Sequence, residues 1–187
     1  VHKLRCQHLK AELPFLRLSL GSIKAGLAEA EVFGEGPRPG LLELAQRGTV
    51  YISEIDLAPK ALQARLLRAI ETGKYRRVGS GVELPCTAKV ICSTREDLNQ
   101  MTEEGSFRRE LNIHLSTFGI SLPSLSERSE DVPEVVKALL PKVSKAGRCQ
   151  LVFDELPSEL VEFLQKYPPP GNIRGVEQSL LRLVTHA

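Results

Sequence analysis

"RGTVYISEID" (residues 47–56) is the stretch that decides the fold, because it joins a buried-strand pattern to carboxylates at its end. Val50, Tyr51 and Ile52 are apolar or aromatic and favour a strand, and Glu54 follows almost at once. In open α/β sheets, ligands bind at the carboxyl ends of the strands. We therefore expect the chemistry of this chain near Ser53 and Glu54.

Strand and helix patterns alternate on both sides of this stretch. Short apolar runs predict further strands, at 14–20, 88–94 and 118–123. Apolar residues at helical spacing predict helices, at 22–33, 58–73, 96–105 and 107–115. Gly73 is a stop signal for the clearest of these helices. The alternation predicts an α/β fold with a mostly parallel sheet flanked by helices.

The pattern changes after about residue 124. Helical segments follow one another between Pro and Gly breaks, at 130–147, 157–167 and 172–187. Only "CQLVF" (149–153) has a weak strand pattern there. We expect an α/β domain at 1–125 and a small helical domain at 126–187.

Composition excludes several classes of protein. The 187 residues are 42% hydrophobic and carry a net charge of +2, which indicates a globular protein and gives no sign of nucleic-acid or membrane binding. No run approaches the roughly 18 apolar residues that span a bilayer. The four cysteines form no CxxC pair, so we expect no metal site and a reducing cytoplasm. The only Met is Met101, so we expect a fragment of a longer protein.

Six collinear segments resemble one known family. They are "RPGLLELAQRGTVYISEID", "QARLLRAIETGKYRRVGS", "AKVICSTREDL", "EEGSFRRELNIHL", "LPSLSERSEDVP" and "YPPPGNIRGV". Together they resemble the AAA+ central domain of bacterial enhancer-binding proteins, the sigma-54-dependent activators of the NtrC type. The resemblance covers essentially the whole chain. It implies a P-loop-type parallel sheet, a small C-terminal helical lid, and a ring that hydrolyses ATP to remodel RNA polymerase.

The resemblance assigns the strand end to the Walker B motif. The family has an aspartate at position 53, which helps to hold magnesium, and a glutamate at position 54, which orients the attacking water. This chain keeps the glutamate as Glu54, the catalytic candidate. Ser53 occupies a nucleotide-binding position, but a hydroxyl lacks the negative charge that a hard divalent cation favours. Magnesium therefore stays an open question. The family's phosphate-binding loop is expected just before residue 1.

The resemblance also assigns positions for nucleotide binding and for the arginine fingers. Arg95 stands at sensor I, where the family usually has an asparagine, and Arg174 matches sensor II. Arg108 aligns with the first arginine finger, whereas His114 replaces the second. A neutral imidazole stabilises developing phosphate charge less well than a guanidinium does. Both changes are expected to weaken catalysis.

The largest departure concerns the family's sigma-54 loop, of sequence GAFTGA. In "AEVFGEGPRPGLLELA" (30–45), only "EGP" lies between the two flanks of that loop. We therefore expect the domain of a bacterial transcriptional regulator that is degenerate, binding ATP or another nucleotide and oligomerising rather than remodelling sigma-54. An active ATPase of the same fold driving transcription activation is the alternative, and an interaction scaffold is a third. Expected partners are copies of itself as a ring or dimer, RNA polymerase, and DNA through a domain outside this chain.

Overall fold

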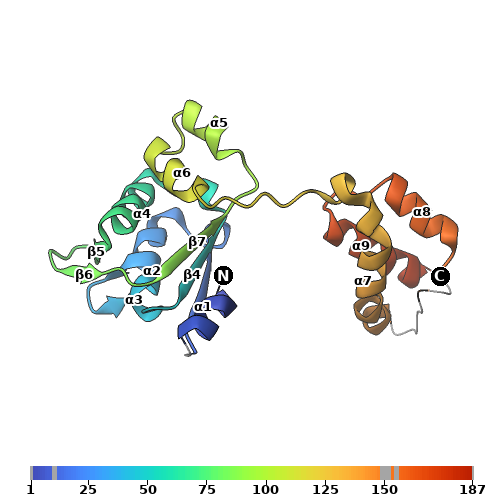
Figure 1. The fold of residues 1–187 in the computed structure, drawn as a ribbon, viewed down its shortest axis with the longest axis horizontal. Helices are drawn as coiled ribbons and strands as arrows, with labels where there is room; N and C mark the ends of the chain where they lie inside the picture. The colour runs from blue at the N-terminus through green and yellow to red at the C-terminus, as the bar shows by residue number, and fades with distance from the viewer. Residues whose placement is uncertain (1, 10–11, 148–152, 154–155, 187) are drawn as a thin grey trace. The chain divides into compact units, whose positions relative to one another are not determined.

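The computed structural model describes residues 2–9, 12–147, 153 and 156–186, and it divides into two compact units. Unit 1 is Val1–Gly119 and unit 2 is Ile120–Ala187. The division falls after Gly119, a few residues before the boundary that we expected after residue 125. Each unit has its own hydrophobic core. Figure 1 shows the helices and strands that make up the units.

The centre of unit 1 is a parallel sheet in the order β1-β4-β7, comprising β1 (Phe15–Ser19), β4 (Thr49–Ser53) and β7 (Lys89–Ser93). Its central strand carries the quoted stretch. Val50 and Ile52 are fully buried, whereas Tyr51 is only partly buried. The predicted parallel sheet flanked by helices is confirmed.

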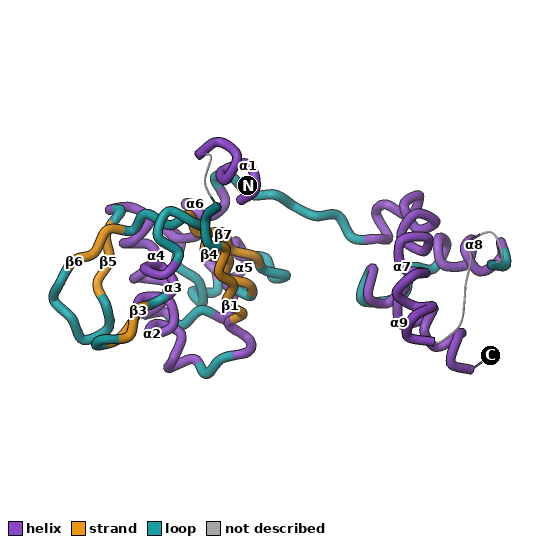
Figure 2. Tube along the Cα trace, turned by 90° about the horizontal axis from the view of Figure 1, so that it is seen from below, coloured by secondary structure: helices purple, strands orange, loops and turns teal. Residues whose placement is uncertain are grey.

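Three helices cover one face of this sheet, namely α2 (Ala28–Phe33), α3 (Leu41–Leu44) and α4 (Lys60–Thr72) (Figures 1 and 2). Their apolar side chains form the core together with β4, and Phe33, Leu62 and Leu66 are almost fully buried. The predicted stop at Gly73 is confirmed, because its φ of +64° ends α4 in the left-handed conformation that glycine adopts without strain.

The other helices of unit 1 are short. They are α1 (His2–Leu9), α5 (Leu98–Glu103) and α6 (Arg109–Ser116), with 3-10 helices η1 (Leu20–Ser22), η2 (Ala25–Leu27) and η3 (Ile55–Leu57). The helix predicted at 22–33 is thus only half α-helical. Gly21 lies just before the irregular half and Gly26 lies within it, in keeping with the low helix propensity of glycine.

Two hairpins were not predicted. One pairs β2 (Gly34–Glu35) with β3 (Arg38–Pro39), and Gly36 and Pro37 form its two-residue turn. The other pairs β5 (Lys74–Arg76) with β6 (Glu83–Pro85). A backbone bond of 2.8 Å from Val78 N to Gly34 O connects the two hairpins.

The strand predicted at 118–123 was wrong. The described backbone there has no strand partner, and Phe118, Ile120 and Leu122 are each more than 80% exposed. A strand needs a neighbour for its backbone hydrogen bonds, and Pro123 has no N–H to donate. The weak strand pattern at 149–153 lies, apart from Phe153, outside the described residues.

All regular secondary structure among the described residues of unit 2 is helical, as predicted. It contains the 3-10 helix η4 (Leu125–Asp131) and the helices α7 (Val132–Gly147), α8 (Ser158–Lys166) and α9 (Ile173–His186). Buried Leu125, Val136 and Val176 belong to its core. The Asn172 side chain accepts a bond of 2.7 Å from the Leu125 backbone, which joins the start of α9 to η4.

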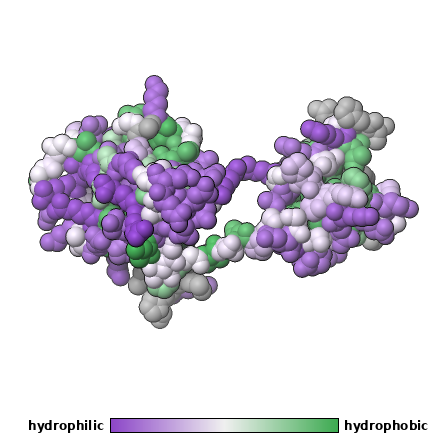
Figure 3. Space-filling view, turned by 90° about the horizontal axis from the view of Figure 1, so that it is seen from above, coloured by the Kyte–Doolittle hydropathy of each residue, from purple (hydrophilic) through white to green (hydrophobic). Residues whose placement is uncertain are grey.

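The visible surface is mostly hydrophilic, with hydrophobic residues in small groups (Figure 3). Among the described helices, none combines the length and the apolar character that a membrane crossing requires.

Candidate nucleotide site at the strand ends

The carboxyl edge of the sheet is a row of three serines. Ser19, Ser53 and Ser93 end β1, β4 and β7 in the same register. The row is neutral, and the Ser53 hydroxyl donates to the backbone carbonyl of Leu18 at 3.4 Å. The position that the resemblance assigns to the magnesium carboxylate therefore carries a hydroxyl engaged with the neighbouring strand.

Glu54 is held by the end of β1. Its Oε2 accepts hydrogen bonds from Ser19 Oγ at 2.6 Å and from the Gly21 backbone N–H at 3.3 Å. A Cβ at Gly21 would lie only 2.7 Å from that oxygen, so glycine leaves the room that the carboxylate uses. Glu54 itself has a φ of +60°, a left-handed conformation that costs about 1–3 kcal/mol for a non-glycine residue.

The other polar groups near the strand ends bond to their own neighbours. Asp56 accepts from Thr94 Oγ1 at 2.7 Å, and Tyr51 and Ser93 share a hydroxyl–hydroxyl bond of 2.8 Å. No group of three or more metal-ligating side chains is found in the described parts of the chain. Because Glu54 and Asp56 are engaged in hydrogen bonds and position 53 is uncharged, these strand-end residues fit a magnesium ion poorly.

Arg95 is exposed just beyond the end of β7. Among the described residues, its guanidinium forms no ion pair with Glu54 or Asp56, whose carboxylates bond to Ser19, Gly21 and Thr94. Arg174 is exposed in the first turn of α9 and belongs to unit 2. The roles that the resemblance implies for these two arginines remain predictions.

Gln63 fixes the start of the finger region. Its buried amide donates to Ala58 O at 2.8 Å and to Ser106 O at 3.2 Å, and its carbonyl oxygen accepts from the Arg108 backbone at 2.8 Å. Phe107 is buried beside it, whereas the Arg108 side chain is exposed. The predicted finger is thus presented to solvent from a rigid base at the N-terminus of α6.

His114 lies in the last turn of α6 and contacts α4. Its Nε2 is 3.1 Å from Glu71 Oε1, and both side chains are partly exposed. The imidazole that replaces the second finger therefore has a partner within its own chain.

Gln63→Ala is expected to lower the free energy of unfolding by about 2 kcal/mol, because it leaves buried backbone groups without partners. Urea denaturation followed by circular dichroism measures this loss. Gln100→Ala is the matched control, because Gln100 is exposed and its side chain bonds to the exposed Glu104. Equal midpoints for the two variants would show that Gln63 is dispensable.

Comparison with known proteins identifies the family. Residues 1–121 match the family described as "Sigma-54 interaction domain". The chain belongs to this family. The expected AAA+ fold and the resemblance to NtrC-type regulators are therefore confirmed for this sigma-54 interaction domain.

Its relatives are bacterial regulators. The domain is 33% identical over 196 residues to the "Nif-specific regulatory protein" of Sinorhizobium fredii, covering 100% of this chain and 32% of that protein. It is 31% identical over 179 residues to the "DNA-binding transcriptional regulator NtrC" of Rhizobium meliloti, covering 91% and 36%. The domain thus spans about a third of the length of these relatives.

Solved structures agree with this fold. NtrX from Brucella abortus in complex with ADP is 28% identical, with a TM-score of 0.84 over 97% of this chain and 42% of that chain. Hsp104 of S. cerevisiae in a casein complex is 18% identical, with a TM-score of 0.60 over 99% of this chain and 36% of that chain, which shows likeness of fold alone.

Sequence reasoning missed several residues that shape this site. Ser19 at the end of β1 and Gly21 in η1 hold Glu54 although both lie far from it in the sequence, and no local pattern marks that contact. Gln63 did leave a signal, since it is a polar residue beside Leu62 and Leu66 on the buried side of α4.

Proposed function

We propose that this sigma-54 interaction domain is regulatory: it binds a nucleotide and assembles, but it neither hydrolyses ATP at a useful rate nor remodels sigma-54. Its membership of a family of transcriptional regulators gives the context. The observation that carries the proposal is the short β2–β3 hairpin, which stands where the family's sigma-54 loop is expected.

The hairpin is closed and braced. Arg77 donates to both oxygens of Glu43 on α3, at 3.0 and 2.7 Å, and to the Gly36 carbonyl in the turn at 2.8 Å. This carboxylate raises the pKa of Arg77 further, so the brace stays charged. A two-residue turn held in this way has no segment long enough to reach into a polymerase complex.

The strand ends support the loss of turnover. Glu54 is occupied by Ser19 and Gly21, and Ser53 offers no charge to a metal ion. Phosphoryl transfer from ATP depends on a glutamate that is free to orient the attacking water and on a carboxylate that holds the metal ion, and we infer that the engagement of Glu54 and the serine at position 53 weaken both functions. The proposal combines these losses with the short hairpin.

The support for nucleotide binding comes from similar proteins of known structure. NtrX from Brucella abortus, at 28% and 27% identity, was crystallised in complexes with ADP and with ATP. We infer that ATP or another nucleotide binds this domain as a structural ligand, with Arg95 as a phosphate contact. Self-association, contact with RNA polymerase, and DNA binding through other regions of a longer protein complete the proposal.

The full-length gene product is expected to release phosphate from ATP and Mg²⁺ at least about a hundredfold more slowly than an active member of the family, since losing one charge-stabilising group costs about that much. Steady-state phosphate release measures the rate. Glu54→Gln should leave this background unchanged, and Glu96→Gln is the matched exposed control. Turnover that collapses only in Glu54→Gln would establish the alternative, an active ATPase.

A second assay tests the remodelling of sigma-54 polymerase separately from ATP hydrolysis. In transcription from a sigma-54 promoter, the protein is expected to form no open complex with ATP or with a non-hydrolysable analogue. Open-complex formation that requires hydrolysable ATP would refute the proposal.

A further inference from the structure

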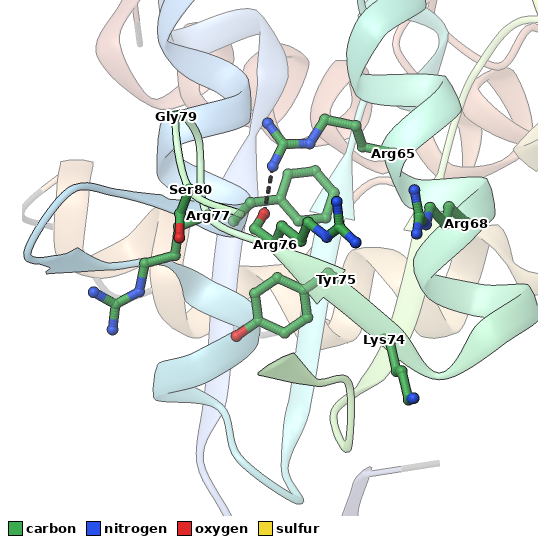
Figure 4. Close-up of a pocket in the computed structure, with 9 residues that line it drawn as sticks. Arg65, Arg68, Lys74, Tyr75, Arg76, Arg77, Gly79 and Ser80 are labelled. Atoms are coloured by element: carbon green, nitrogen blue, oxygen red, sulfur yellow. Dashed lines mark hydrogen bonds between the residues drawn. The ribbon is translucent and has the colours of Figure 1, made fainter. Parts of the chain in front are cut away.

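A basic pocket of about 290 Å³ lies between α4 and the β5–β6 hairpin, away from the strand ends (Figure 4). Its cationic side chains are Arg65, Arg68, Lys74, Arg76 and Arg77. Sequence analysis gave this region no role.

Three of these cations share one carboxylate. Arg68 Nη2 and Arg76 Nη2 lie 3.2 and 3.0 Å from Glu83 Oε1, and Lys74 Nζ lies 3.9 Å from Oε2. Three positive charges against one negative charge leave an excess of two. The hydrogen bond and charge of Arg76, followed by the charges of Lys74 and Arg68, lower the pKa of Glu83, so it remains ionised.

The other two arginines, Arg65 and Arg77, form ion pairs with other carboxylates. Arg65 pairs with Glu29 at 3.0 Å, lies over the Phe33 ring at 4.5 Å, and donates to the Arg76 carbonyl. Arg77 is bound to Glu43, and Figure 4 shows its guanidinium directed away from those of Arg68 and Arg76. These contacts fix the backbone from which Arg76 projects.

The three converging cations are accessible to a solute. The side chains of Arg68, Lys74 and Arg76 are 59%, 63% and 45% exposed. Beside them, burial raises the pKa of Tyr75 to about 12, with smaller contributions from Glu43 and Cys86, so its phenol adds no negative charge at neutral pH. The uncompensated charge therefore faces solvent.

We propose that Arg68, Lys74 and Arg76 bind a phosphate dianion, such as the terminal phosphomonoester of a small molecule, and that Glu83 occupies this site until the ligand displaces it. Guanidinium forks match phosphate oxygens, and a double charge matches the excess of two. The donors converge on one carboxylate instead of forming a line, which favours a compact dianion over a nucleic-acid backbone.

Inorganic phosphate is the probe, titrated into the 187-residue chain at low ionic strength and followed by calorimetry. Arg68→Gln/Arg76→Gln should weaken binding about tenfold or more, because charge-assisted hydrogen bonds are lost. Arg47→Gln/Lys89→Gln removes the same charge from exposed sites elsewhere in unit 1 and should leave the affinity within about twofold. Glu83→Gln should bind phosphate about tenfold more tightly, because the internal competitor is gone.

The Glu83→Gln result decides the matter if the double arginine variant fails to fold, which circular dichroism would reveal. No saturable binding by either the parent or Glu83→Gln would overturn the proposal. Equally weak phosphate binding by the Arg47→Gln/Lys89→Gln control would show that the affinity depends on net charge alone, which would also overturn the proposal. A DNA duplex that binds this surface but is not displaced by phosphate would also overturn the proposal and indicate a nucleic-acid surface.

Discussion

Gly40→Ala is expected to lower the free energy of unfolding of unit 1 by about 4 kcal/mol or more, the range reached only when a substitution cannot be accommodated. A Cβ at this position would lie 2.2 Å from Gly34 N, 2.4 Å from the Phe33 carbonyl carbon and 2.6 Å from Val32 O. All three atoms belong to the backbone, so no side-chain rotation relieves the overlap. The base of the β2–β3 hairpin would have to separate from α2.

Urea denaturation of Gly40→Ala beside Gly81→Ala tests this expectation. Gly81 lies in the β5–β6 loop with nothing within 4 Å of an added Cβ, so its variant should stay within about 0.5 kcal/mol of the parent. A Gly40→Ala protein as stable as the Gly81→Ala protein would mean that the backbone around Gly40 is not packed as tightly as described.

Phe33→Ala is expected to cost about 3–5 kcal/mol, the usual range for removing a fully buried aromatic side chain. The ring is inaccessible to solvent, lies 5.9 Å from the Tyr75 ring between centroids, and lies under the Arg65 guanidinium. Its loss would therefore disturb α2, the hairpin that follows it and the basic pocket together.

The matched control is Phe118→Ala, which makes the same chemical change at a side chain that is 84% exposed. That variant should unfold within about 0.5 kcal/mol of the parent, because it removes little buried area. Thermal denaturation ranks the two variants. Similar midpoints would contradict the burial of Phe33.

The elements that sequence could predict are those whose apolar pattern is long enough to read. The helix at 58–73 and the strand at 49–53 were found because burial on one side or on both leaves a clear periodicity. The β2–β3 hairpin was missed because its strands have two residues each and depend on contacts with Val78 and Arg77. The segment at 118–123 is as apolar as a strand but lacks a partner.

For the candidate site, the sequence predicted which residues lie at the strand ends but did not reveal their contacts. Ser53 ends β4 and Glu54 follows it directly, as expected. The bonds from Ser19 and Gly21 to Glu54 depend on strand register, and the pairing of His114 with Glu71 depends on how α6 packs against α4. Neither relation is encoded locally.

The closed turn at Gly36 and Pro37 also makes this domain a natural acceptor for a transplanted loop. Glu35 and Arg38 already face each other across the pair, and a side chain at Gly36 would meet open space. An insert placed between Gly36 and Pro37 would leave from a joined stem with the Arg77 brace beneath it. The loop and the strand-end residues could in this way be restored one at a time in the same domain. Such variants would separate the contribution of the loop to sigma-54 remodelling from the contribution of the strand ends to ATP hydrolysis.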